Sequence, residues 1–137
     1  MAKTFKQAFI YDGVYSEYRK KTVGNDPSEI PPDRFVVCIQ NHDQIGNRML
    51  GERLSKLVSY DMLKLSAGVM LTSPFVPMLF MGEEWSEPNP FLYFVSHTDP
   101  ELAEAVRKGR KAEFAAFHVK GEAPDPMAEE TFGNSKL

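Results

Sequence analysis

Two short apolar runs with a helical pattern between them organise the middle of the chain. Residues 35–39 are apolar, include β-branched and aromatic side chains and closely follow a pair of prolines, which predicts a strand buried on both faces. Apolar positions at roughly helical spacing predict a helix over residues 59–72, and a second apolar run over residues 76–81 ends at Gly82. Strand, helix and strand in this order predict a βαβ unit with parallel strands and a right-handed crossover.

The flanking segments carry weaker patterns. Residues 3–12 predict a short helix, and residues 13–33, with their glycines and prolines, predict an irregular excursion. The clearest helix start is Asp99, a suitable N-cap that is followed by proline in the first turn, and the apolar positions of this helix continue to Phe117. Residues 121–137 carry two prolines among polar neighbours and predict a tail.

Length and charge limit the classes of function. The 137 residues suit one domain or part of one, since domains typically hold ~100–150 residues, whereas a complete (β/α)₈ barrel needs roughly 250. A net charge of −3 provides no electrostatic argument for nucleic acid or anionic membranes as partners. The apolar stretch over residues 67–81 is interrupted by Ser73, Pro74 and Pro77 and is shorter than the ~20 apolar residues of a transmembrane helix.

Cys38 is the single cysteine, so no disulfide can form within the chain. Its place in the first predicted strand predicts a buried thiol in a reducing compartment. The N-terminal residues lack the apolar core of a secretion signal. These observations together predict a cytoplasmic location.

Polar side chains crowd directly after the first predicted strand. They are Asn41, His42, Asp43, Gln44, Asn47 and Arg48. Nothing in the physics of a strand calls for such a cluster, and in parallel α/β sheets and barrels the carboxyl ends of the strands are where ligands and chemistry lie. The cluster therefore predicts a functional site or part of one.

These residues carry a resemblance to a known family. Residues 35–43 resemble the strand-seven signature of the α-amylase superfamily of glycoside hydrolases, an apolar strand that ends in His-Asp, and the continuation through Arg48 resembles the maltooligosyltrehalose trehalohydrolases. Residues 73–85 resemble that family's strand eight and the following loop, and the motifs within 91–102 resemble the next segment. Residues 9–16 resemble its approach to strand seven.

The resemblance implies an α/β fold, namely a partial (β/α)₈ barrel of about two parallel strands, equivalent to strands seven and eight, with flanking helices and long loops. Residues 1–120 would form the C-terminal part of the catalytic barrel, and residues 121–137 a tail that leads toward an absent C-terminal domain. The family's nucleophilic aspartate and acid/base glutamate belong to strands four and five, and those blocks are absent from this sequence.

The implied function is that of a fragment of a retaining glycoside hydrolase that releases trehalose from maltooligosyl-trehalose by cleaving an α-1,4-glucosidic bond. We expect the isolated chain to be inactive and to self-associate through unpaired strand edges. The expected partner is the maltooligosaccharide substrate, with no cofactor. Two alternatives stay open: a branching or debranching enzyme fragment of the same superfamily, or a non-catalytic carbohydrate-binding or interaction module.

Asp43 is the candidate catalytic residue. Retaining glycosidases use a nucleophilic and an acid/base carboxylate about 5–5.5 Å apart, on either side of an oxocarbenium-like transition state. The α-amylase superfamily adds a third carboxylate, which Asp43 matches, so the resemblance implies that Asp43 stabilises the transition state. The alternative is an aspartate that caps the next turn. For His42 the resemblance implies donation to a sugar hydroxyl, and the alternative is a bond to a backbone carbonyl.

Five further residues are candidates for substrate binding. Asn41, Gln44, Asn47 and Arg48 carry amide and guanidinium groups that suit pairs of sugar hydroxyls, although each also suits the bracing of a loop. Trp85 would stack on a sugar face or serve as a packing anchor.

Two other kinds of site are not supported by the sequence. Glu83 and Glu84 are adjacent and point in different directions, so they cannot flank one glycosidic bond as a catalytic pair. His42, His97 and His118 are scattered without a metal-binding spacing, and we expect no metal.

Overall fold

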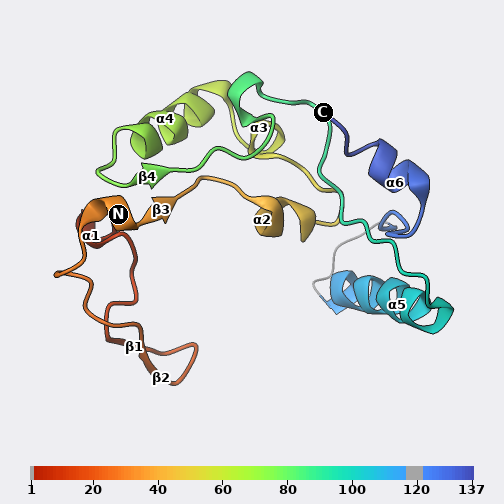
Figure 1. Cartoon of the computed structure of the whole chain (residues 1–137), viewed down its shortest axis with the longest axis horizontal. Coiled ribbons are helices and arrows are strands. Elements are labelled where there is room, and N and C mark those ends of the chain that lie inside the picture. The colour runs from red at the N-terminus through yellow and green to blue at the C-terminus, as the bar shows by residue number, and fades with distance from the viewer. Residues whose placement is uncertain (1, 117–121) are drawn as a thin grey trace. The chain divides into compact units, whose positions relative to one another are not determined.

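The computed structural model describes residues 2–116 and 122–137, and Figure 1 shows its elements in chain order. The chain divides into two compact units. The first joins the N-terminal segment up to Ile39 with Leu65–Met78, and the second joins Gln40–Lys64 with Leu79–Leu137. Phe117, at the end of the predicted helix, and His118 lie outside the described residues.

A parallel pair of strands lies at the centre of the first unit. β3 (Val36–Val37) pairs with β4 (Val76–Pro77), in a register that sets Val36 opposite Val76. Helix α4 (Tyr60–Leu71) lies between the strands in sequence, and its part from Leu65 onward belongs to this unit. The predicted order of strand, helix and strand and the parallel pairing are confirmed.

The strands are shorter and more exposed than the sequence predicts. Only two residues of the apolar run 35–39 form a strand, and the side chain of Val36 is 64% exposed. The prediction of a strand buried on both faces is therefore wrong for this structure. The physical reason is that, among the described residues, β3 has β4 as its one neighbour, and a two-stranded sheet cannot shield both faces of its strands.

The segment predicted to be irregular contains a β-hairpin. β1 (Val14–Ser16) pairs antiparallel with β2 (Lys21–Val23), and the backbone N–H of Arg19 donates to the Ser16 hydroxyl at 3.2 Å within the turn. Gly24 follows β2 with φ 80°, and a Cβ there would collide with the carbonyl oxygen of Tyr11. Strands of three residues carry too little alternation to be recognised from sequence.

Short helical elements complete the first unit. Helix α1 (Ala2–Gln7) ends earlier than the predicted 3–12, because Ala8 adopts the left-handed conformation with φ 65°. A single turn of 3₁₀ helix, η1 (Pro32–Arg34), precedes β3. Phe35 packs its ring edge to face against Phe9 at 5.8 Å and against Phe75 at 5.9 Å between centroids. These aromatic contacts link the N-terminal segment to the residues that precede β4.

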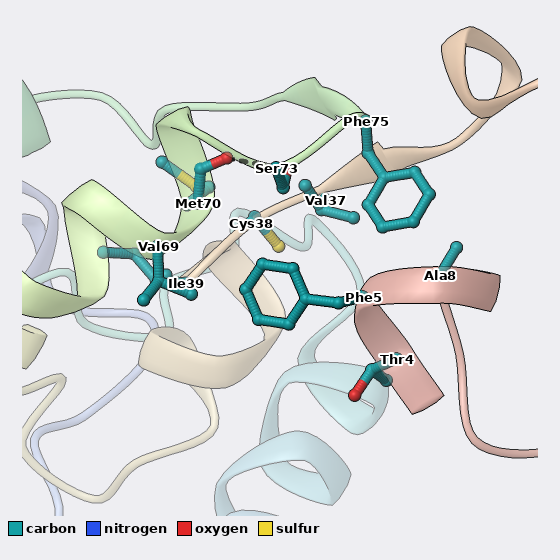
Figure 2. Close-up of a pocket in the computed structure, with 10 residues that line it drawn as sticks. All are labelled: Thr4, Phe5, Ala8, Val37, Cys38, Ile39, Val69, Met70, Ser73 and Phe75. Atoms are coloured by element: carbon teal, nitrogen blue, oxygen red, sulfur yellow. Dashed lines mark hydrogen bonds between the residues drawn. The ribbon is translucent and has the colours of Figure 1, made fainter. Parts of the chain in front are cut away.

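The first unit contains an apolar cavity of about 160 Å³, shown in Figure 2. The picture places the Phe5 ring and the Cys38 sulfur beside this space, and the Ser73 hydroxyl donates to the Met70 carbonyl oxygen at 2.7 Å. Cys38 is half-buried, so its thiol is less enclosed than the sequence predicts. The lining residues are Thr4, Phe5, Ala8, Val37, Cys38, Ile39, Val69, Met70, Ser73 and Phe75.

Helix α5 (Pro100–Ala116) is the longest helix of the second unit. The Asp99 carboxylate accepts hydrogen bonds from the backbone N–H groups of Glu101 at 2.9 Å and Leu102 at 3.4 Å, which confirms the predicted N-cap. The other helical elements of this unit are α2 (His42–Gly46), α3 (Leu54–Leu57), η2 (Glu83–Trp85) and α6 (Glu129–Gly133).

Four phenylalanine rings form an aromatic chain through the second unit. Phe91 contacts Phe80 at 5.2 Å and Phe94 at 5.9 Å between ring centroids, and Phe94 contacts Phe132 at 5.1 Å. The planes of each pair lie 67–83° apart, which is the edge-to-face geometry that aromatic quadrupoles favour. Phe132 belongs to α6, so the aromatic chain attaches the C-terminal segment to the unit.

The segment predicted as a tail is therefore folded where it is described. Besides α6, it contains the buried Ser135, whose hydroxyl donates to the Thr131 carbonyl oxygen at 2.9 Å and accepts from the Leu92 N–H at 3.0 Å. The Asn89 side chain donates to the carbonyl oxygen of Lys136. Partners distant in sequence supply hydrogen bonds of these residues, and their role as a tail that leads toward a further domain stays a prediction.

A buried arginine holds the backbone of the second unit together. Arg53 is 2% exposed, and its guanidinium donates to the carbonyl oxygens of Met81 and Asn89, each at 2.7 Å. Burial lowers the pKa of Arg53, and the nearby Glu87 and Glu83 oppose that shift. The Asn89 N–H and the Trp85 indole hold the pKa of Glu87 below its ordinary value.

The observed architecture is mixed α/β with two-stranded sheets in the described residues. The α/β part of the predicted fold class is confirmed, and the placement of β3 and β4 in a barrel stays a prediction. None of the helices found in residues 2–116 and 122–137 has the length and apolar character needed to cross a membrane.

We predict that Arg53→Met destabilises the protein strongly. The substitution leaves the carbonyl oxygens of Met81 and Asn89 without their donor and Glu87 without a nearby positive charge, which is expected to cost roughly 2–5 kcal/mol. Urea unfolding followed by the emission of Trp85, the single tryptophan, measures the free energy of unfolding. Arg48→Met is the matched control, because its pairing with Glu52 at 3.2 Å is exposed and worth about 0.5 kcal/mol. Equal losses in the two variants would contradict the anchoring role.

We also predict that the isolated chain forms dimers or larger assemblies. The two-stranded sheet of β3 and β4 has open edges in the described structure, and Val36 and Val76 have exposed side chains. Open edges and exposed apolar faces favour pairing with another copy. Light scattering over a concentration series measures the mass, and a constant monomer mass at high concentration would show that the chain covers its own edges.

Candidate functional site

The polar cluster predicted as a loop folds into the short helix α2. Asn41 is its N-cap, with φ −151°, and its side-chain oxygen accepts a hydrogen bond from the Gln44 N–H at 2.9 Å. Asparagine is among the residues that suit this position best, because its short side chain satisfies a free N–H of the first turn. Asn41 thus has a structural role, and its role in substrate binding stays a prediction.

His42 and Asp43 form the first turn of α2 and lie largely in solvent. Their side chains are 71% and 74% exposed, and His42 Nε2 lies 3.0 Å from Asp43 Oδ1. The oxygen that caps α2 comes from Asn41, so the observed geometry differs from the alternative in which Asp43 caps the turn. The Asp43 carboxylate is thus accessible to a ligand.

A hollow of about 290 Å³ lies beside these residues within the second unit. This volume is near the lower end of the ~300–1,000 Å³ range of small-molecule sites. The hollow brings three sequence-predicted residues together with part of the aromatic segment. Its lining consists of His42, Asp43, Gly46, Asn47, Phe91, Leu92, Tyr93 and Phe94.

Four of the predicted site residues do not line this hollow. Gln44 is exposed, and Asn41 serves as the cap of α2. The Arg48 guanidinium donates to Glu52 at 3.2 Å. Trp85 is 59% exposed, and its indole N–H donates to Glu87 at 2.9 Å. The structure therefore does not bring Trp85 to the hollow.

The aromatic wall of the hollow, formed by Phe91, Tyr93 and Phe94, was not predicted as part of the site, and neither was Arg110. Arg110 of α5 donates to the Gly46 carbonyl oxygen at 3.0 Å and to Asn47 Oδ1 at 3.2 Å, at the end of α2. Its guanidinium carbon also lies 4.5 Å from the ring centroid of Tyr93. The aromatic residues at 91, 93 and 94 were a visible signal, whereas their link to an arginine distant in sequence was not.

The hollow has an acidic and aromatic character. Asp43 supplies a carboxylate, His42 and Asn47 supply groups that hydrogen-bond to hydroxyls, and neither lysine nor arginine is among its lining residues. Across the described ranges 2–116 and 122–137, no group of three His, Cys, Asp or Glu side chains is arranged to hold a metal ion. The arrangement suits a neutral ligand that carries hydroxyl groups.

Known proteins match this chain along its whole length. The chain is 47% identical over 137 residues to the malto-oligosyltrehalose trehalohydrolase of Saccharolobus solfataricus, covering 100% of this chain and 23% of that protein. It is 48% identical over 140 residues to the enzyme of that name from Brevibacterium helvolum, covering 24% of its length. The match to the Deinococcus radiodurans enzyme is 43% identical over 143 residues and covers 23% of it.

A solved structure resembles the chain as well. A crystal structure from Salmonella typhimurium, described as that of a "putative alpha amylase", matches with a TM-score of 0.91 and 44% sequence identity. The match covers 99% of this chain and 23% of that one. No protein-family model matches the chain.

The chain thus spans about a quarter of the length of these relatives. The resemblance seen in the sequence motifs is confirmed along all of the chain, and the structural match is of the α-amylase type. Over its whole length, this chain is homologous to a segment of the malto-oligosyltrehalose trehalohydrolases.

Proposed function

We propose that the chain contributes the transition-state-stabilising carboxylate, Asp43, to a retaining glycoside hydrolase. This enzyme would release trehalose from maltooligosyl-trehalose by cleaving an α-1,4-glucosidic bond. The observation that carries the proposal is the full-length identity of 43–48% to enzymes named trehalohydrolases. The exposed position of Asp43 beside a hollow of suitable character supports it.

The proposed role of Asp43 follows from the charge of the reaction. As the glycosidic bond breaks, the sugar ring gains oxocarbenium character, and a carboxylate beside it becomes more favourable than it was in the ground state. Asp43 would stabilise this charge without transferring a proton. His42 and Asn47 would hydrogen-bond to the hydroxyls of the ring that is being distorted.

The hollow contains one carboxylate, whereas the retaining reaction needs a nucleophile and an acid/base in addition. We infer that residues outside this sequence supply both in the longer enzyme. In that enzyme β3 and β4 would be strands seven and eight of a (β/α)₈ barrel, residues 1–120 its C-terminal part, and residues 121–137 the connection to a further domain. The parallel pairing of β3 with β4 supports this placement.

The remaining proposals concern binding and location. Four predicted binding residues do not line the hollow, namely Asn41, Gln44, Arg48 and Trp85. They would contact the substrate only if further parts of the enzyme position the substrate beside them. We propose a cytoplasmic location. The trehalohydrolase assignment is preferred to a branching or debranching enzyme, because the relatives named above are trehalohydrolases.

We predict that Asp43→Asn removes most of the turnover in an intact enzyme. The test uses a chimera in which this chain replaces the aligned stretch of the Saccharolobus solfataricus relative. The substitution is nearly isosteric, so kcat is expected to fall about 10²–10³-fold while KM changes little. Asp61→Asn is the matched control, because its carboxylate is exposed on α4 and pairs only with the nearby Lys64 in the ion pairs of the described residues. A folded Asp43→Asn chimera that keeps its kcat would refute the assignment.

We further predict that the 137-residue chain by itself does not release trehalose from maltooligosyl-trehalose. One carboxylate in the hollow cannot act as nucleophile, acid/base and charge stabiliser at the same time. The assay uses purified chain at high substrate concentration and long incubation, with trehalose as the measured product. Reproducible turnover that disappears in Asp43→Asn would show that the chain holds a complete catalytic site.

A further inference from the structure

We propose that Tyr93 is a stacking platform for one glucose unit of an α-linked glucan beside Asp43, and that Arg110 is the positioning residue that holds this platform. The inference deepens the proposed function and rests on it, because Asp43 marks where a sugar ring is bound. It assigns a sugar-binding role to a tyrosine and an arginine that the motifs after β3 do not include.

The packing of the three aromatic rings in the hollow distinguishes Tyr93 from its neighbours. Phe91 and Phe94 belong to the edge-to-face aromatic chain, in which their rings contact Phe80 and Phe132. Those two rings therefore take part in the packing of the second unit, and Phe94 is 36% exposed. The ring of Tyr93 is instead paired with a cation, since the guanidinium carbon of Arg110 lies 4.5 Å from its centroid.

Tyr93 lines two neighbouring cavities. Arg110 lines a small cavity together with Tyr93 and Phe114, whereas the hollow beside Asp43 is lined by Tyr93 and not by Arg110. The Arg110 guanidinium lies over one face of the Tyr93 ring. The tyrosine is 37% exposed and lines the hollow together with Asp43, and the sugar position that we propose is the ring face that Arg110 does not cover.

Arg110 fixes the tyrosine relative to α2. Its side chain is 13% exposed, and besides Tyr93 it stacks over Phe114 at 4.7 Å. The same guanidinium donates to the Gly46 carbonyl oxygen and to Asn47 Oδ1, which belong to the end of the helix that begins with His42 and Asp43. One planar guanidinium thus contacts both the Tyr93 ring and the end of α2. A lysine cannot reproduce this arrangement, because its ammonium group neither stacks on a ring as a plane nor donates hydrogen bonds in a fixed fork.

The chemistry of the hollow selects a sugar over other ligands. The C–H face of a pyranose ring is apolar and packs on an aromatic face, while its hydroxyls project from the rim of the ring. Here the rim groups would meet Asp43, His42 and Asn47, which line the same hollow. An anionic ligand would face the Asp43 carboxylate, and the guanidinium beside the hollow, that of Arg110, is already bonded to Gly46, Asn47 and Glu113. A purely apolar ligand would not use the polar groups of the lining.

The test titrates the full 137-residue chain, labelled with ¹⁵N, with maltotriose. We expect amide signals of residues 42–47 and 91–94 to shift together, and nuclear Overhauser effects to join sugar C–H protons to the ring protons of Tyr93. Tyr93→Phe keeps the ring and is expected to keep the affinity. Tyr93→Leu keeps an apolar side chain without the ring face and is expected to weaken binding about tenfold.

Arg110→Lys tests the positioning role, with Lys108→Met on the exposed side of the same helix as its control. We expect Arg110→Lys to weaken maltotriose binding while the shift pattern of the unbound chain changes only near Tyr93 and α2. Affinity that is unchanged in both Tyr93→Leu and Arg110→Lys would overturn the platform.

The proposal would also be overturned if no amide signal shifted at the highest maltotriose concentration, or if the sugar contacted only residues other than Tyr93. Those contacts are measured in the unsubstituted chain, so the conclusion does not depend on the folding of a variant. The proposed function is judged separately by the kcat of Asp43→Asn in the chimera. Loss of the platform and failure of the catalytic assignment are therefore distinguishable.

Discussion

The second unit depends on one buried charge, the guanidinium of Arg53. Between Leu79 and Asp99 this unit contains a single turn of 3₁₀ helix and otherwise irregular chain, so some backbone carbonyls there depend on side chains for hydrogen bonds. Arg53 satisfies two of them, at Met81 and Asn89, and its positive charge lies near the carboxylates of Glu83 and Glu87. A charge that is removed from water is tolerated only with such partners. The two carboxylates thus offset the positive charge of the arginine, and its hydrogen bonds tether the backbone at Met81 and Asn89 to it.

The candidate site depends on a second arginine for a related reason. Helix α2 has five residues, and a helix so short is not stable in water on its own. It is held at its beginning by the side chain of Asn41 and at its end by Arg110. This restraint places His42 and Asp43 at a defined position while their side chains stay exposed. An exposed charged group on a fixed backbone is suited to act on a ligand, because the backbone need not rearrange when the ligand binds.

The residues of the hollow and the length of the homologous enzymes are both consistent with the proposal that this chain supplies one part of a catalytic site. The described hollow offers one carboxylate, a set of hydrogen-bonding groups and an aromatic wall, which are the groups that we propose bind a sugar and stabilise charge on it. It does not suffice for the double displacement of a retaining glycosidase. The homologous enzymes are about four times as long as this chain, which is consistent with a catalytic site assembled from several parts of a larger protein.

Local sequence determined the elements whose causes are local. The parallel strands with a helix between them, the helix that begins after Asp99 and the polar cluster that follows β3 were all predictable, because apolar spacing and capping act over a few residues. Tertiary structure decided the rest. The length of β3 depends on its neighbouring strand, the folding of residues 122–137 depends on partners such as Leu92, and the burial of Arg53 depends on carbonyls up to 36 positions away. The backing of Tyr93 by Arg110 belongs to the same class, since hydrogen bonds and stacking between distant residues leave no periodic pattern in the sequence.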